Sequence, residues 1–142
     1  MNQHQKFQDT PVDIKIKLAG LWASVMFCYI YGDYFGLYRL GDLQDMINGV
    51  MGPLGPITQT KLAAVSLIMI PSSLMIFLSL VLKPVYNRFL NLFFGVFYTL
   101  LMVVTLPGAW LFYILYGIIE IGLTLLIIGY AWRWGRAGGI LN

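Results

Sequence analysis

The sequence is poor in the residues on which disulfides and metal sites depend. It has one cysteine, Cys28, and one histidine, His4, and only 11% of its 142 residues are charged. A single cysteine excludes an intramolecular disulfide. One histidine and one cysteine cannot make up a zinc or haem site within one chain. We therefore expect no metal ion and no cofactor.

Apolar residues take the place of the missing charges and make up 59% of the chain. A soluble domain averages about 45–50% apolar and about 25% charged residues, so this composition excludes a soluble globular domain. It also excludes a disordered chain, which cannot keep so much apolar surface in water. The net charge of +3 sits at the ends of the apolar runs rather than on one face, so we expect no nucleic-acid binding. The composition indicates an integral membrane protein, whose first partner is the lipid bilayer.

Four uniform apolar runs are long enough to cross a bilayer, which takes about 20 residues of helix. They cover residues 18–38, 62–82, 89–106 and 109–132. The runs lack the alternation of a barrel strand, and a backbone in lipid must satisfy its own hydrogen bonds. The sequence therefore predicts an all-α fold, a single domain over residues 1–142 that forms a bundle of four transmembrane helices.

The segments around these runs predict further detail. Thr10 followed by Pro11 is typical of a helix start, with the hydroxyl as N-cap and proline at the first helical position. The short connection over residues 106–108 predicts that the last two spans are antiparallel neighbours. Tryptophans near the inner span ends, Trp22, Trp132 and Trp134, are typical of an aromatic belt at the membrane interface.

The outer loop, residues 39–61, is the only sizeable segment between spans. Its apolar residues recur at helical spacing and predict a short amphipathic helix on the membrane or at the mouth of the bundle. These residues are Leu43, Met46, Ile47, Val50 and Met51.

Two carboxylates lie within the predicted spans, Asp33 in the first and Glu120 in the fourth. A charge at the bilayer centre costs on the order of 3 kcal/mol on insertion scales, so such residues usually face a cavity or a partner. At 1.5 Å per residue, Glu120 is near the midplane and Asp33 is roughly 9 Å nearer the outer surface. That separation is too large for a direct pair unless the helices tilt or shift.

Polar side chains accompany both acids. Tyr29 lies one turn before Asp33, and Glu120 belongs to a stripe of polar residues along its helix. Together with two polar residues of the third span, these side chains could line a cavity for a small cation or a lipophilic ligand. They could equally be structural, because hydrogen bonds between spans commonly hold bundles together at about 0.6 kcal/mol each. The further candidate residues are Tyr113, Tyr116, Thr124, Asn91 and Thr99.

Small residues recur every four positions along the first span. Such a stripe lets another helix approach closely, and it predicts a helix-packing surface that includes Cys28 as a small packing residue. A chain of this size makes one thin bundle, so a homodimer is the simplest assembly in which a pathway could form. The residues of the stripe are Gly20, Ser24, Cys28, Gly32 and Gly36.

Several motifs resemble those of a known family. They are IKIKL (residues 14–18), FCYIYGDYFGLY (27–38), MGPLGP (51–56), LPGAW (106–110) and YAWRW (130–134). Together they resemble a family of small bacterial four-span membrane proteins of unknown function, and the chain is loosely similar in size and layout to DoxX-like proteins. The resemblance implies a multi-pass protein of the bacterial inner membrane and supplies no activity or catalytic residue.

Three functions remain open from the sequence. The first is a small transporter, or a proton or cation pathway, in which Glu120 exchanges a proton for its substrate. The second is a non-enzymatic membrane subunit or lipophile-binding bundle whose acids are structural. An intramembrane enzyme ranks last, because the sequence has no Ser-His, Cys-His, metal or paired-acid constellation.

The charges flanking the spans predict the orientation of the chain. Seven basic residues flank the spans on the side of the termini, against Arg39 and Lys61 on the other, so both termini are expected in the cytoplasm. Reporter fusions after Asn142 and within residues 49–55 should report opposite sides of the membrane, and a periplasmic C-terminus would contradict the prediction. The seven are Lys6, Lys15, Lys17, Lys83, Arg88, Arg133 and Arg136.

Overall fold

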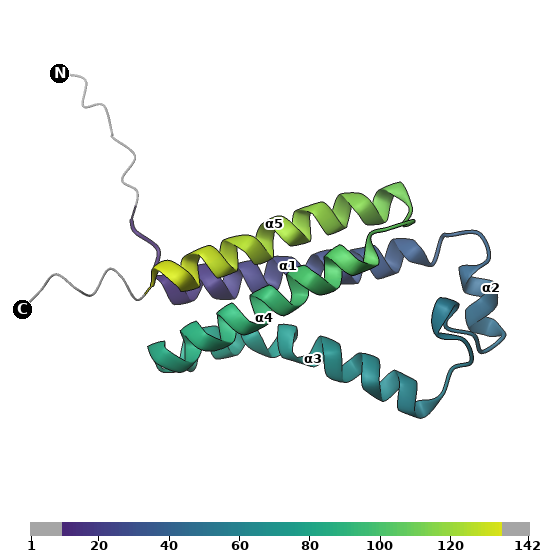
Figure 1. Ribbon diagram of the computed structural model, residues 1–142, viewed down its shortest axis with the longest axis horizontal. Coiled ribbons are helices and arrows are strands. Elements are labelled where there is room, and N and C mark those ends of the chain that lie inside the picture. Colours follow the sequence, from purple (N-terminus) through teal and green to yellow (C-terminus); the bar gives the residue numbers. More distant parts are fainter. Residues whose placement is uncertain (1–9, 135–142) are drawn as a thin grey trace, which may run out of the picture.

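The computed structural model describes residues 10–134, and within them it contains helices and no strand. The four long helices have 22 or 23 residues each and are long and apolar enough to cross a membrane, which confirms the all-α prediction. A short helix and a 3₁₀ turn lie in the outer loop (Figure 1). The elements are α1 (Ile14–Gly36), α2 (Asp42–Ile47), η1 (Gly52–Leu54), α3 (Gln59–Val81), α4 (Pro84–Thr105) and α5 (Leu111–Arg133).

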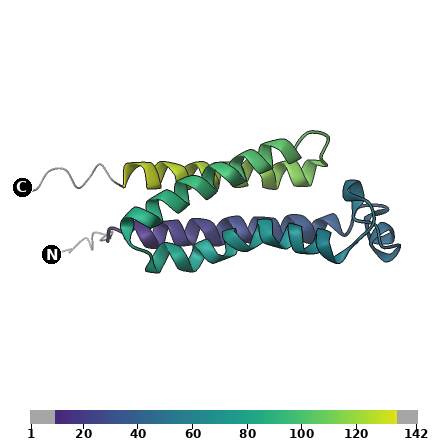
Figure 2. The ribbon, with the colours of Figure 1, turned by 60° about the horizontal axis from the view of Figure 1, so that its bottom comes forward.

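Helix α1 packs against both α3 and α5, and α5 packs in turn against α4. The predicted antiparallel pairing of α4 and α5 is therefore confirmed. We call the end where α1 begins and α5 ends the inner end, and the end that carries α2 the outer end. Helices α3 and α4 meet toward the inner end and diverge toward the outer end, as Figures 1 and 2 show.

The helices begin at other residues than the sequence suggested. Helix α1 starts at Ile14, and its N-cap is Asp13, whose carboxylate accepts a hydrogen bond of 2.8 Å from the Lys15 amide. The prediction that Thr10 caps this helix was wrong, because a carboxylate nearer the apolar run takes that role. Helix α4 starts earlier than expected, at Pro84, where the fixed φ of proline suits the first helical position.

The outer loop holds a shorter helix than predicted. Helix α2 ends at Ile47, and Gly49 follows in a left-handed conformation with φ of +74°. Val50 then forms an isolated antiparallel bridge with Pro56, so the helical pattern that extended to Met51 does not continue. The Lys61 ammonium donates hydrogen bonds to two carbonyls of the loop and ties it to the start of α3.

The hydrophobic core lies between the inner halves of the four long helices. Trp22 is at its centre and is fully buried, whereas the sequence suggested a place in the interfacial belt. Its indole N–H donates a hydrogen bond of 2.8 Å to Asn91 Oδ1, which removes its need for interfacial water. The other fully buried members of this cluster are Leu18, Val25, Met75, Tyr98 and Ile127.

Close helix contact through glycine occurs between α4 and α5. A Cβ atom at Gly95 would lie 2.8 Å from Ile128 Cγ1, and one at Gly117 would lie 2.5 Å from Leu106 Cδ2. In contrast, a Cβ atom at Gly20, Gly32 or Gly36 would meet nothing within 4 Å among the described residues. The three glycines of the α1 stripe thus have no close partner helix in the part of the chain that the structure describes, and the packing role of the stripe stays a prediction.

The Gly95 contact predicts a difference between two glycines. Replacing Gly95 by leucine should separate α4 from α5 and destabilise the protein by about 1–3 kcal/mol, the usual cost of overpacking. Gly122→Leu is the matched control, because Gly122 is also helical and has open space around it. Thermal unfolding in detergent should show a lower melting temperature for Gly95→Leu alone, and equal melting temperatures would contradict the contact.

Candidate functional site

Glu120 lies between α5 and α1 and is the only acid buried among the described residues. Its side chain is 2% exposed, and Oε2 is buried with no hydrogen-bond partner among them. Across the interface, on α1, are Asp33 and Tyr29, both within range of electrostatic interaction with Glu120. The structure thus brings both acids to one place, although no hydrogen bond joins them.

The Tyr29 hydroxyl is the second unsatisfied group in this interface. It is buried and has no hydrogen-bond partner among the described residues, while its ring lies 6.2 Å from that of Tyr98. Nearly all buried polar side-chain atoms in proteins have a partner, so each exception requires an explanation. The buried carboxyl oxygen and the buried phenol on facing helices each have unused hydrogen-bonding capacity. A proton, a water molecule or a cation could fill it.

An open pocket of about 540 Å³ leads from the outer end to this interface. Asp33 and Tyr113 line it, and its rim includes the Arg39–Asp42 ion pair, whose atoms are 3.2 Å apart. Arg39 also lies 5.3 Å above the ring of Trp110. The outer acid of the pair is therefore reachable from the outer end, whereas Glu120 lies behind it. The remaining lining residues are Ile30, Gly32, Tyr34, Gly36, Leu37, Met46 and Phe112.

The other polar residues of the α5 stripe have separate contacts. Tyr116 stacks on Phe35 of α1, with ring centroids 6.3 Å apart. The Thr124 hydroxyl donates to the backbone carbonyl of Glu120 at 3.0 Å and accepts a hydrogen bond of 2.7 Å from Thr99. The threonines therefore join α4 to α5 without contacting the carboxylate.

Asn91 lies outside this site, in a polar network at the inner end. Its side-chain amide donates to Asn87 Oδ1 at 2.6 Å and accepts from Trp22, and both asparagines are fully buried. Asn87 donates in turn to the carbonyl of Ser79 at 2.6 Å. The network connects α1, α3 and α4, and its satisfied hydrogen bonds indicate a structural role.

The sequence interpretation missed the role of Tyr98. Its hydroxyl donates to the carbonyl of Ile68 at 2.6 Å and accepts from the amide of Ser72 at 3.1 Å. These two backbone groups are one turn apart in α3, on either side of Pro71, where the helix lacks one amide donor. No sequence pattern within α4 predicts the contact of Tyr98 with α3. The spacing of Asn87 and Asn91, one turn apart, does predict a buried polar face on the same helix.

The described residues contain no group of three or more His, Cys, Asp or Glu side chains that could hold a metal ion. Asp33 and Glu120 supply two carboxylates. Cys28 is half-buried on α1, and Ser24 of the small-residue stripe donates to the carbonyl of Gly20 in its own helix. His4 lies outside the described residues.

Comparison with known proteins identifies a family whose function is unknown. A family of unknown function, DUF6326, matches residues 8–139. No curated protein and no solved structure matches the chain.

The polar network predicts that Asn91 acts in stability. Asn91→Ala leaves the Trp22 indole N–H without its acceptor and Asn87 Oδ1 without its donor, which should cost about 1–3 kcal/mol. Ser66→Ala is the control, because Ser66 is exposed and bonds only to Leu62 of its own helix. Thermal unfolding in detergent should show the loss for Asn91→Ala only; a variant as stable as the parent protein would show that the network contributes nothing.

Proposed function

The chain belongs to the DUF6326 family, whose function is unknown, and from the interface between α1 and α5 we propose that it conducts protons or small cations across the membrane. The observation that carries the proposal is the buried Oε2 atom of Glu120, which has no hydrogen-bond partner among the described residues. An acid whose role is only to join helices is expected to bond to one of them.

The two acids form the binding site of this pathway. Asp33 and Glu120 interact electrostatically across the interface. In surroundings of low dielectric, two nearby negative charges repel strongly, and the pair gains by taking up a proton or a cation. The phenol groups of Tyr29 and Tyr113 supply hydrogen-bond donors, or aromatic faces for an organic cation.

Access to the site differs between the two ends. The open pocket reaches Asp33 from the outer end. Toward the inner end the path meets the core around Trp22, Tyr98 and Ile127, which are fully buried. Release on the inner side therefore requires a second conformation, as alternating access does in other transporters.

A dimer would enlarge the pathway. The small-residue stripe of α1 has open space at Gly20, Gly32 and Gly36 and adjoins Asp33 in the sequence. A second copy packed on this stripe would cover the outer pocket from the side and enclose the acids, which one thin bundle does not do.

Flux measurements on reconstituted protein test the pathway. Vesicles that hold a pH-sensitive dye should show uptake with the parent protein and no more than empty vesicles with Glu120→Gln, because glutamine keeps the shape of glutamate and cannot bind a proton. Asp33→Asn should also reduce uptake. Asp45→Asn is the matched control, since Asp45 is an exposed acid of α2.

Two results would contradict the proposal. Equal uptake by Glu120→Gln and Asp45→Asn would show that the buried acid is not needed. Absence of any proton or cation flux in the parent protein, together with normal folding of Glu120→Gln, would favour the alternative of a subunit or lipophile-binding bundle with structural acids.

A further inference from the structure

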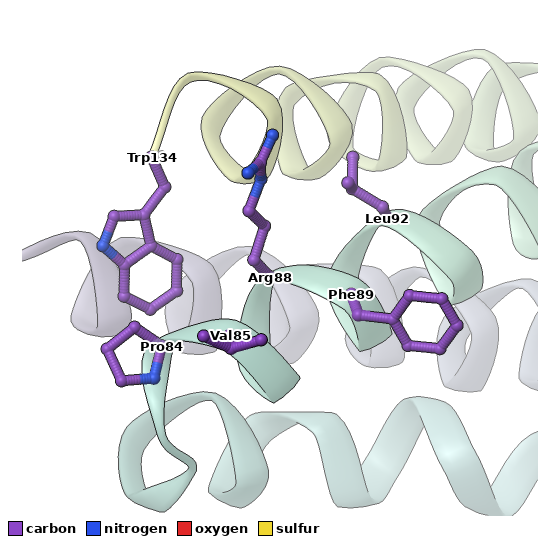
Figure 3. Close-up of a pocket in the computed structure, with 6 residues that line it drawn as sticks. All are labelled: Pro84, Val85, Arg88, Phe89, Leu92 and Trp134. Carbon is purple, nitrogen blue, oxygen red and sulfur yellow. The ribbon is translucent and has the colours of Figure 1, made fainter. Parts of the chain in front are cut away.

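A groove of about 350 Å³ lies at the inner end, between the start of α4 and the end of α5. Figure 3 shows Arg88 reaching from α4 toward the end of α5, with Trp134 and Pro84 together on one side of it. This groove is remote from Glu120 and is independent of the proposed pathway. Its lining residues are Pro84, Val85, Arg88, Phe89, Leu92 and Trp134.

Among residues 10–134, Arg88 has no matching anion in this groove. Its Nε atom is buried and has no hydrogen-bond partner among them, and their one ion pair joins Arg39 to Asp42. A long contact of 3.5 Å from Nη2 to the carbonyl of Trp132 is its one hydrogen bond there. A guanidinium group has five N–H donors in a planar fork that fits a phosphate, so most of this capacity is unused.

The surroundings of Arg88 add positive potential. Pro84 begins α4 without an amide hydrogen, and the free backbone amides that follow it in the first turn, together with the helix dipole, favour an anion. Lys83 is the N-cap residue of the same helix and adds a second positive charge at this end. Asp33 and Glu120 lie farther from this end, and the carboxylate of Asp13, which is at this end, accepts from the Lys15 amide as the N-cap of α1.

The rest of the groove is apolar and follows the axis of α4. Val85, Phe89 and Leu92 are about one turn apart and cover roughly 10 Å from the inner end toward the middle of the span. Phe89 is 65% exposed, so its ring is open to an apolar ligand in the groove. A soluble anion would gain nothing from this apolar wall, whereas a lipid would place its acyl chain along it and its headgroup at the inner end, near the indole of Trp134.

We propose that this groove binds one anionic phospholipid, whose phosphate pairs with Arg88 and whose acyl chain lies along Phe89 and Leu92. The flanking charges predict that the inner end is on the cytoplasmic side, where anionic lipids provide such headgroups. Basic pockets between spans on that side are suited to anionic headgroups. The lipid would complete the hydrogen bonding of Arg88 and hold the start of α4 against the end of α5.

Native mass spectrometry of the full chain in detergent tests the site. Phosphatidylglycerol and phosphatidylcholine with the same acyl chains are titrated separately. We expect phosphatidylglycerol to bind preferentially and Arg88→Gln to weaken it about tenfold, the loss of one charge-assisted contact. Arg133→Gln is the matched control, since Arg133 belongs to the same end but lines a different pocket.

A second variant separates a lipid from a free anion. Leu92→Trp fills the apolar part of the groove and keeps Arg88, so it should also weaken phosphatidylglycerol binding. If Arg88→Gln does not fold, Leu92→Trp still tests whether the groove binds the lipid. Equal binding of both lipids, equal losses in Arg88→Gln and Arg133→Gln, or full displacement of phosphatidylglycerol by inorganic phosphate would each overturn the proposal.

Discussion

The structure depends on one constraint, which is that a polar group inside a bilayer must find its hydrogen-bond partner within the protein. The core of the inner half meets this constraint with a connected set of side chains. Trp22, Asn91 and Asn87 form a chain of hydrogen bonds that ends on the carbonyl of Ser79. The ammonium of Lys15 caps the end of α3 by donating to the carbonyls of Leu80 and Leu82. These contacts connect α1, α3 and α4 at the inner end.

The outer half of the α1–α5 interface departs from this constraint at two atoms, Glu120 Oε2 and the hydroxyl of Tyr29. Leaving a buried polar group unpaired costs about 1–3 kcal/mol. That cost is hard to explain in a structural contact, since leucine would pack there without it. It is expected where a ligand, a proton or a water molecule completes the hydrogen bonds, as we propose for this interface and for the groove around the unpaired Nε of Arg88 at the inner end.

The spans could be predicted from the sequence because their length and apolar content alone decide them. The helix starts could not be predicted to the residue, because several capping side chains compete near each start; Asp13 rather than Thr10 caps α1. The grouping of polar residues was harder still. Asn91 and Glu120 each lie on a recognisable polar face, but nearly uniform apolar helices do not reveal how they are rotated about their axes. That rotation places Asn91 against Trp22, and Glu120 against Tyr29 and Asp33.

The same reasoning explains where the molecule has freedom to move. Helix α3 is joined to the bundle by the Ser79 and Lys15 contacts near its inner end and by Tyr98 beside Pro71 at its middle. Beyond Pro71 its outer half diverges from α4 (Figure 1), and its apolar side chains, such as Leu67, are largely exposed. A proline removes one backbone hydrogen bond and weakens the helix at that point. Movement of the outer half would therefore break fewer side-chain hydrogen bonds than movement of the inner half. This half lies at the end of the molecule where the open pocket reaches Asp33.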